Sequence, residues 1–156
     1  TIQEIMMRYR FFFLSFLFAI SLQAANILDL VGLLDRNDMV TFQSRVQTLN
    51  DANSAREDNN KTILMYACWV GNTEAVKYLV LKGANVNAQD SGGATALHLA
   101  AWKGFTPIAL YLIENGASGQ SVSKDGMTPF DIAMMQGNQK IADAISKAAP
   151  KLKPLL

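Results

Sequence analysis

The sequence predicts an all-α fold: a solenoid of about four stacked units, each a helix–turn–helix followed by a hairpin loop. Two observations predict it. When the 156-residue chain is aligned with itself at an offset of 33 residues, threonine, alanine and glycine coincide at fixed places without a gap. Between these fixed residues, apolar side chains recur at helical spacing. Internal repetition of this period is characteristic of solenoids, so it decides the fold class before any single motif is considered.

The first helix of each unit is expected to begin and end at the same residue types. A threonine acts as its N-cap, and a proline follows that threonine in the last unit. A glycine ends the helix in the left-handed conformation. A tight turn with a positive φ, at asparagine or glycine, precedes the threonine. The N-caps are Thr62, Thr95 and Thr128; the end glycines are Gly71, Gly104 and Gly137; the turn residues are Asn60, Gly93 and Gly126.

The second helix of each unit is expected to start shortly after that glycine. It begins near Thr73 in one unit and at Thr106 in the next, where Pro107 takes the first helical position behind a threonine cap. Apolar residues at helical spacing follow, and Gly83 or Gly116 ends the helix. The stretch ANVNAQDSGG then returns to the next unit as an extended loop.

The units at both ends of the array are weaker copies. A further offset of 33 towards the N-terminus aligns Val31 and Leu34 with helix positions, but Asp38 stands where the other units have glycine. Terminal repeats are atypical because one side has no neighbouring repeat. The predicted organisation is upstream residues and a signal peptide at 1–25, an N-terminal cap repeat at 26–57, repeats at 58–90 and 91–123, a C-terminal cap repeat at 124–149 and a short tail at 150–156.

The N-terminal segment MRYRFFFLSFLFAISLQA differs in kind from the repeats. Arg8 and Arg10 precede an apolar run at 11–22, and the small residues Ala24 and Ala25 follow it. This order is typical of a cleavable secretory signal peptide, and the run is about half as long as a bilayer-spanning helix. We therefore expect a periplasmic or secreted protein with no stable membrane insertion after cleavage. A retained membrane anchor is the alternative.

The charge balance and the cysteine content exclude several classes of protein. Lys and Arg number 14 against 13 Asp and Glu, a formal net charge of +1, whereas a nucleic-acid-binding domain carries a strong basic surplus. A single cysteine cannot form an internal disulfide, and no Cys/His cluster has the spacing of metal ligands. We expect no nucleic-acid partner, no metal, no cofactor, and a monomer.

The repeat residues resemble the ankyrin repeat, in a small exported bacterial form. GGATALHLAAWKG is similar to the family's signature of a turn glycine, Thr-Pro-Leu-His and Ala-Ala, with Ala96 in place of proline. KGANVNA is similar to the family's closing loop, and the last unit keeps Thr128 and Pro129 but has Asp131 at the histidine position. The resemblance covers nearly all of the chain after the signal segment. It implies an ankyrin solenoid with a non-catalytic, protein-binding role.

His98, the only histidine, is the most obvious candidate for chemistry, and we interpret it as structural. At this position of the ankyrin repeat, the resemblance implies hydrogen bonds to the backbone and to the cap threonine that tie neighbouring hairpins together. The sequence places no carboxylate or nucleophile to make His98 a general base. Met65 and Asp131 occupy the same place in other units, so nothing chemical repeats. No catalytic residue is predicted.

Three other motifs have simpler explanations than function. Ser121 and Lys124 match a Ser-x-x-Lys pattern, but the stretch falls in an inter-repeat loop and the partner motifs are absent. Cys68 aligns with Met134 at an interior helix position, so packing explains it. The stretch NKT at 60–62 is a glycosylation sequon, and a turn asparagine followed by a helix cap explains the same residues.

The resemblance also implies which residues contact a partner: the tips of the hairpin loops and the two residues before the glycine of the first helix. One such row reads Arg36, Trp69, Trp102 and Met135, residue types that are enriched in interface cores. The alternative is that both tryptophans pack against the next repeat. The full set is Arg36, Asn37, Trp69, Val70, Trp102, Lys103, Met135 and Gln136 on the helices, and Asp58, Asn59, Lys61, Ser91, Ala94, Lys124, Asp125 and Met127 at the tips.

Two functions from different classes fit these observations. The first is a non-catalytic module that binds another protein in the periplasm on its concave hairpin and first-helix face. The second is an accessory factor that handles a small ligand or cofactor such as haem, linked to catalase and oxidative-stress defence, which the resemblance allows. The residues that could serve as ligands in the second are His98, Met65, Tyr66, Cys68 and Met135. No feature of the sequence favours an enzyme.

Overall fold

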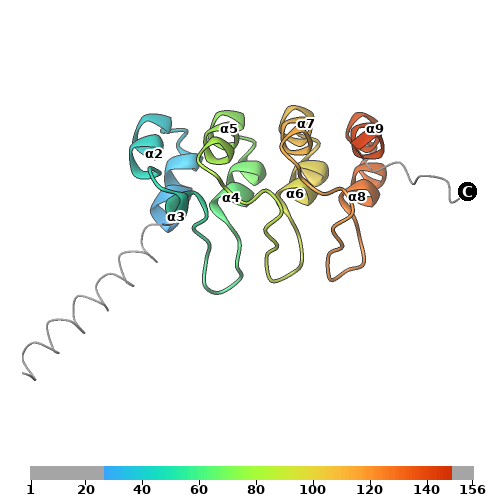
Figure 1. Cartoon of the computed structure of the whole chain (residues 1–156), viewed down its shortest axis with the longest axis horizontal. Coiled ribbons are helices and arrows are strands. Elements are labelled where there is room, and N and C mark those ends of the chain that lie inside the picture. The colour runs from blue at the N-terminus through green and yellow to red at the C-terminus, as the bar shows by residue number, and fades with distance from the viewer. Residues whose placement is uncertain (1–26, 149–156) are drawn as a thin grey trace, which may run out of the picture.

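The structure, a computed structural model, describes residues 27–148 and confirms the all-α solenoid. The signal segment predicted at 1–25 and the tail predicted at 150–156 lie outside this range. Figure 1 shows a row of helix pairs with three long loops that project on one side. The helices are 27–35, α2 (Met39–Arg45), α3 (Leu49–Ala52), α4 (Ile63–Val70), α5 (Thr73–Leu81), α6 (Ala96–Lys103), α7 (Thr106–Glu114), α8 (Pro129–Met135) and α9 (Gln139–Ala148).

The helices form two layers with the core between them. α4, α6 and α8 contact one another in sequence, as do α5, α7 and α9, and each first helix packs on the second helix of its own unit (Figure 1). Leu64 and Leu79 are buried in one unit, and their equivalents Leu97 and Leu112 are buried in the next. The 33-residue repetition of the sequence is therefore a repetition of core positions.

The predicted boundaries of the first helices are confirmed. Thr62, Thr95 and Thr128 are the N-caps of α4, α6 and α8, and the turn residue two positions before each threonine has a positive φ. The glycine after each helix also has a positive φ, between 71° and 83°. In the last unit α8 ends at Met135 with Gln136 as its C-cap, so this glycine follows the helix one residue later.

The second helices begin where the sequence predicts, near Thr73 and at Thr106, but the predicted cap at Thr106 is wrong by one residue. Asn72 caps α5, where its side chain accepts a hydrogen bond of 2.9 Å from the Ala75 N–H. α7 begins at Thr106 with Phe105 as its N-cap, so Pro107 stands at the second helical position. Phe105 offers no side-chain acceptor, and a proline in the first turn lowers the number of N–H groups that need one.

The N-terminal unit is offset by 34 residues from the next unit. Asn37 has a φ of 54°, and Asp38 caps α2 through a 3.1 Å hydrogen bond from the Thr41 N–H. They are the equivalents of Gly71 and Asn72. The contact between units agrees, because Asn37 Oδ1 accepts a 2.9 Å hydrogen bond from Asn72 Nδ2. Asparagine tolerates the left-handed region best after glycine, which explains why it replaces glycine here.

Met134 does not lie in the interior position that the sequence predicts for it. The equivalent residues Cys68 and Ala101 are fully buried between successive units, whereas Met134 is 49% exposed. The reason is that no further unit packs against α8 within residues 27–148.

The three loops contain no strand within the described residues, only an isolated antiparallel bridge between Ala55 and Thr62. They are joined to one another by backbone hydrogen bonds instead. The Ser91 N–H donates to the Asn59 carbonyl at 2.8 Å, and the Lys124 N–H donates to the Gly92 carbonyl at 2.8 Å. The loop tips therefore hold fixed positions relative to their neighbours.

Candidate protein-binding face

The helix residues that the resemblance implies for partner binding lie at the surface, at the ends of α4, α6 and α8. Trp69 is 46% exposed, Trp102 49% and Met135 65%, and Val70 is also exposed. Successive residues of a helix are separated by about 100° around its axis. The residues just before the last two are buried, so the last two side chains of the helix point outward. We call Trp69, Val70, Trp102, Lys103 and Met135 the tryptophan face.

Trp69 lies beneath two lysines that come from different units. Lys103 Nζ lies 3.8 Å from the centroid of the Trp69 ring, and Lys61 Nζ lies 5.9 Å from it and 6.0 Å from the Tyr66 ring. An ammonium group over an indole face within about 6 Å is attracted by the ring quadrupole. Within residues 27–148, no such ammonium group lies over Trp102. Trp69, Lys61 and Lys103, which the resemblance implies independently as partner-contacting residues, therefore lie together at one place.

Arg36 does not belong to the tryptophan row. Because the N-terminal unit is offset by 34 residues, the residue equivalent to Trp69 is Asp35, and Arg36 is equivalent to Val70. The Arg36 guanidinium folds back on its own helix, with Nη1 3.6 Å from where a Cβ on Gly32 would lie. The row therefore begins with a carboxylate.

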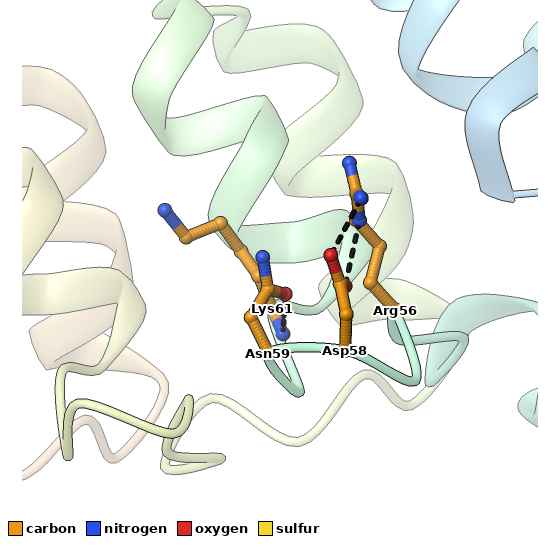
Figure 2. Close-up of polar contacts among 4 residues, drawn as sticks. All are labelled: Arg56, Asp58, Asn59 and Lys61. Carbon is orange, nitrogen blue, oxygen red and sulfur yellow. Dashed lines mark hydrogen bonds and ion pairs between the residues drawn. The ribbon is translucent and has the colours of Figure 1, made fainter.

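The tip of the first loop is organised by Arg56, a residue that the repeat pattern of the sequence does not indicate. Arg56 donates two hydrogen bonds to the Asp58 carboxylate, of 2.9 and 2.7 Å, as Figure 2 shows. These hydrogen bonds keep the pKa of Asp58 below its usual value. Asn59 Oδ1 accepts a 2.9 Å hydrogen bond from the Lys61 N–H, while the Lys61 side chain points away from the ion pair. In the sequence, an arginine two residues before an aspartate in a predicted turn was the signal that could have indicated this ion pair.

The remaining tip residues divide into exposed and structural ones. Ser91, Lys124 and Asp125 are exposed. The Ala94 N–H donates to Asp90 Oδ1 at 2.9 Å, which closes the second turn. Met127 is partly buried against the core.

His98 has a structural role, as the sequence predicts: it braces neighbouring units through hydrogen bonds. It is 2% exposed, and its Nδ1 accepts a 3.0 Å hydrogen bond from the Thr95 N–H and lies 2.9 Å from Thr95 Oγ1. Nδ1 therefore carries no proton, so Nε2 donates to the Met127 carbonyl at 3.2 Å. Burial lowers the pKa of His98 from its usual value, which favours this neutral form. The ring joins the start of α6 to the loop of the next unit.

The other candidates for chemistry are also engaged or covered. Cys68 is fully buried, and this burial raises its pKa well above that of a free thiol. Of the five residues considered for haem, Met65, Cys68 and His98 are buried, Tyr66 is partly buried against the core, and Met135 is exposed. In the described part of the chain, no group of three or more His, Cys, Asp or Glu could hold a metal ion. No helix there is both long and apolar enough to cross a membrane.

Stacked helix pairs joined by fixed loops define a helical repeat solenoid. The chain belongs to the ankyrin repeat family: the family of ankyrin repeats, described as three copies, matches residues 35–123 and 89–153. This family is generally non-catalytic and serves protein–protein interaction. No curated protein matches the chain.

Proposed function

We propose that the protein is an exported interaction module that holds a partner protein on the tryptophan face and the adjoining loop tips in the periplasm. As an ankyrin repeat protein, the chain is a protein–protein interaction module. The observation that carries the choice of face is the exposure of Trp69 and Trp102, which occupy the same position in adjacent units and remain about half exposed. Tryptophan is the residue type most enriched in binding hot spots.

The scaffold behind this face supports the proposal. Asn87 Nδ2 donates to the Gly116 carbonyl at 2.9 Å, and Asn87 Oδ1 accepts from the Ser118 N–H at 2.8 Å. Asn53 makes the same pair of contacts with Gly83 and Asn85 one unit earlier. Because neighbouring loops are already fixed, a partner pays little ordering entropy when it binds them.

Export is supported by the order of residues in the N-terminal segment, basic, then apolar, then small. We propose that cleavage after Ala24 or Ala25 releases the repeats into the periplasm. N-terminal sequencing of protein recovered from a periplasmic fraction tests this step. Protein that keeps the run at 11–22 and fractionates with the membrane would favour the retained anchor.

The binding proposal is tested by capture from a periplasmic extract of the source bacterium, quantified by mass spectrometry. Trp102→Ala removes one indole of the face. Leu81→Ala is the matched control, because Leu81 is an exposed apolar residue at the end of α5, in the other helix layer. A protein that the wild type and the control retain and that Trp102→Ala loses would support the proposal. A hot-spot tryptophan accounts for about thirtyfold or more in affinity. Equal capture by all three proteins would refute it.

A further inference from the structure

Two positive charges meet over one aromatic ring of the tryptophan face. Lys61 lies in the loop before α4, and Lys103 ends α6, so the two ammonium groups approach Trp69 from different units. The shorter distance, 3.8 Å from Lys103 Nζ to the ring centroid, places that ammonium directly against the indole. The ring displaces part of the hydration shell of this ammonium group. A carboxylate that binds the ammonium group therefore competes with fewer water molecules.

Neither lysine is neutralised by the described part of the chain. The ion pairs there are Arg45 with Asp29 and Arg56 with Asp58. Asp58 is the carboxylate nearest to Lys61 in sequence, and Arg56 engages both of its oxygens (Figure 2). The Arg56–Asp58 pair therefore leaves the charge of Lys61 available to another anion.

On either side of Trp69, the row of equivalent positions is apolar towards the C-terminal unit and acidic towards the N-terminal unit. Trp102 and Met135 continue the row on α6 and α8, and both are about half exposed or more. Asp35 occupies the first position of the row and pairs with neither lysine. The charge along the row thus runs from negative at the N-terminal unit to positive around Trp69, followed by apolar surface.

We propose that the tryptophan face recognises an acidic segment of a partner protein, in which Asp or Glu side chains contact Lys61 and Lys103 and a neighbouring apolar side chain contacts Trp102 and Met135. This inference rests on the proposed function. Opposite charge attracts such a segment, and a Lys or Arg at the same place would be repelled by the two ammonium groups. Asp35 limits the acidic part of the segment to the α4–α6–α8 side of the row.

Selection of random peptides displayed on phage against the full-length protein tests the proposal. The selected peptides are then labelled, and their affinities are measured by fluorescence polarisation. We expect Asp and Glu to be enriched beside leucine or aromatic residues. Lys61→Met and Lys103→Met should each weaken these peptides about two- to fivefold, the range for an exposed ion pair. Lys103→Arg, which keeps the charge, should retain most of the affinity.

Two controls separate charge at this site from charge in general. Lys140→Met removes an exposed lysine of α9 and should leave the affinity unchanged. The affinity of the wild type should fall when the ionic strength rises from about 0.1 M to about 1 M, because the Debye length shortens from about 10 Å to about 3 Å. The Lys61→Met/Lys103→Met double variant should lose most of this salt dependence.

The outcomes distinguish this inference from the proposed function. Peptides that need Trp102 but are neutral or basic, or that bind the double lysine variant as tightly as the wild type, would overturn the acidic segment and leave the binding face in place. Selected peptides whose binding is unaffected by both Trp69→Ala and Trp102→Ala would overturn the binding face, and the acidic segment with it.

Discussion

Replacement of His98 by alanine should destabilise the fold without changing the binding surface. The imidazole is buried and joins α6 to the loop of the next unit through Thr95 and Met127. Thr95 and Met127 are affected differently by the loss of the imidazole. The Met127 carbonyl still accepts a 2.9 Å hydrogen bond from the Ser123 N–H, whereas the buried Thr95 N–H has no partner other than His98 within residues 27–148.

The buried Thr95 N–H, together with the Thr95 hydroxyl that loses the same Nδ1 acceptor, sets the magnitude of the effect. Leaving such a group without a partner costs about 1–3 kcal/mol, and for a domain of this size about 1 kcal/mol lowers the melting temperature by roughly 4 °C. His98→Ala should therefore melt roughly 4–12 °C below the wild type. Circular dichroism during heating, with a urea titration in parallel, measures the change.

Asp131→Ala is the matched control, since Asp131 occupies the same position in the last unit. Asp131 accepts hydrogen bonds from Thr128 N (2.9 Å) and Thr128 Oγ1 (2.7 Å), but it is exposed. Water can replace it there, so this variant should lose much less stability than His98→Ala. A His98→Ala protein with the wild-type melting temperature and abolished partner capture would refute the bracing role and make His98 a contact residue.

The pH dependence of stability gives a second readout of the same brace. Burial lowers the pKa of His98 in the folded state below its unfolded value, so the unfolded chain binds a proton more readily. The contribution of neutral His98 is present above its unfolded pKa of about 6.5 and decreases as the pH falls from there towards the lower folded pKa. The wild type should lose stability over this interval, and His98→Ala should not. Equal pH profiles for the two proteins would contradict the assignment.

Three further predictions concern other parts of the molecule. Gly71→Ala should destabilise more than Gly137→Ala in urea unfolding, because both have a positive φ but only at Gly71 would a Cβ lie 2.7 Å from the Phe105 ring; equal effects would contradict this packing. Trp69 and Trp102 should emit at long wavelength and be quenched by iodide, and blue, unquenched emission would contradict their exposure. Mature protein should begin at residue 25 or 26, as Edman sequencing would show.

The sequence predicts the inner units well because their boundaries depend on local chemistry. A threonine that caps a helix and a glycine that ends it form hydrogen bonds with backbone groups no more than about four residues away. Identical residues at a fixed offset therefore produce identical helix boundaries. The N-terminal unit is predicted less well. There Asn37 takes the left-handed position that glycine holds elsewhere, and the one-residue difference in offset has no local signal. The register error at Arg36 follows from this difference alone.

The tryptophan face could be predicted only in part. The exposure of Trp69 and Trp102 follows from their place in the repeat, because equivalent positions face the same way. The approach of Lys61 and Lys103 to one ring depends on side-chain conformations across two units, and the pairing of Arg56 with Asp58 depends on the shape of one turn. Neither repeats with the period of the sequence, so the repeat could not indicate it.

Stability and the proposed recognition depend on different residues. His98 and Asn87 connect neighbouring units through buried or backbone hydrogen bonds, and neither ring nor amide is part of the tryptophan face. Trp102 and Lys103 lie at the other end of α6 from His98 and contribute little to the core, because both are exposed. Substitutions in the two groups should therefore have nearly additive effects. Such separation allows the exposed face to change its partner while the hydrogen bonds that stack the units stay the same.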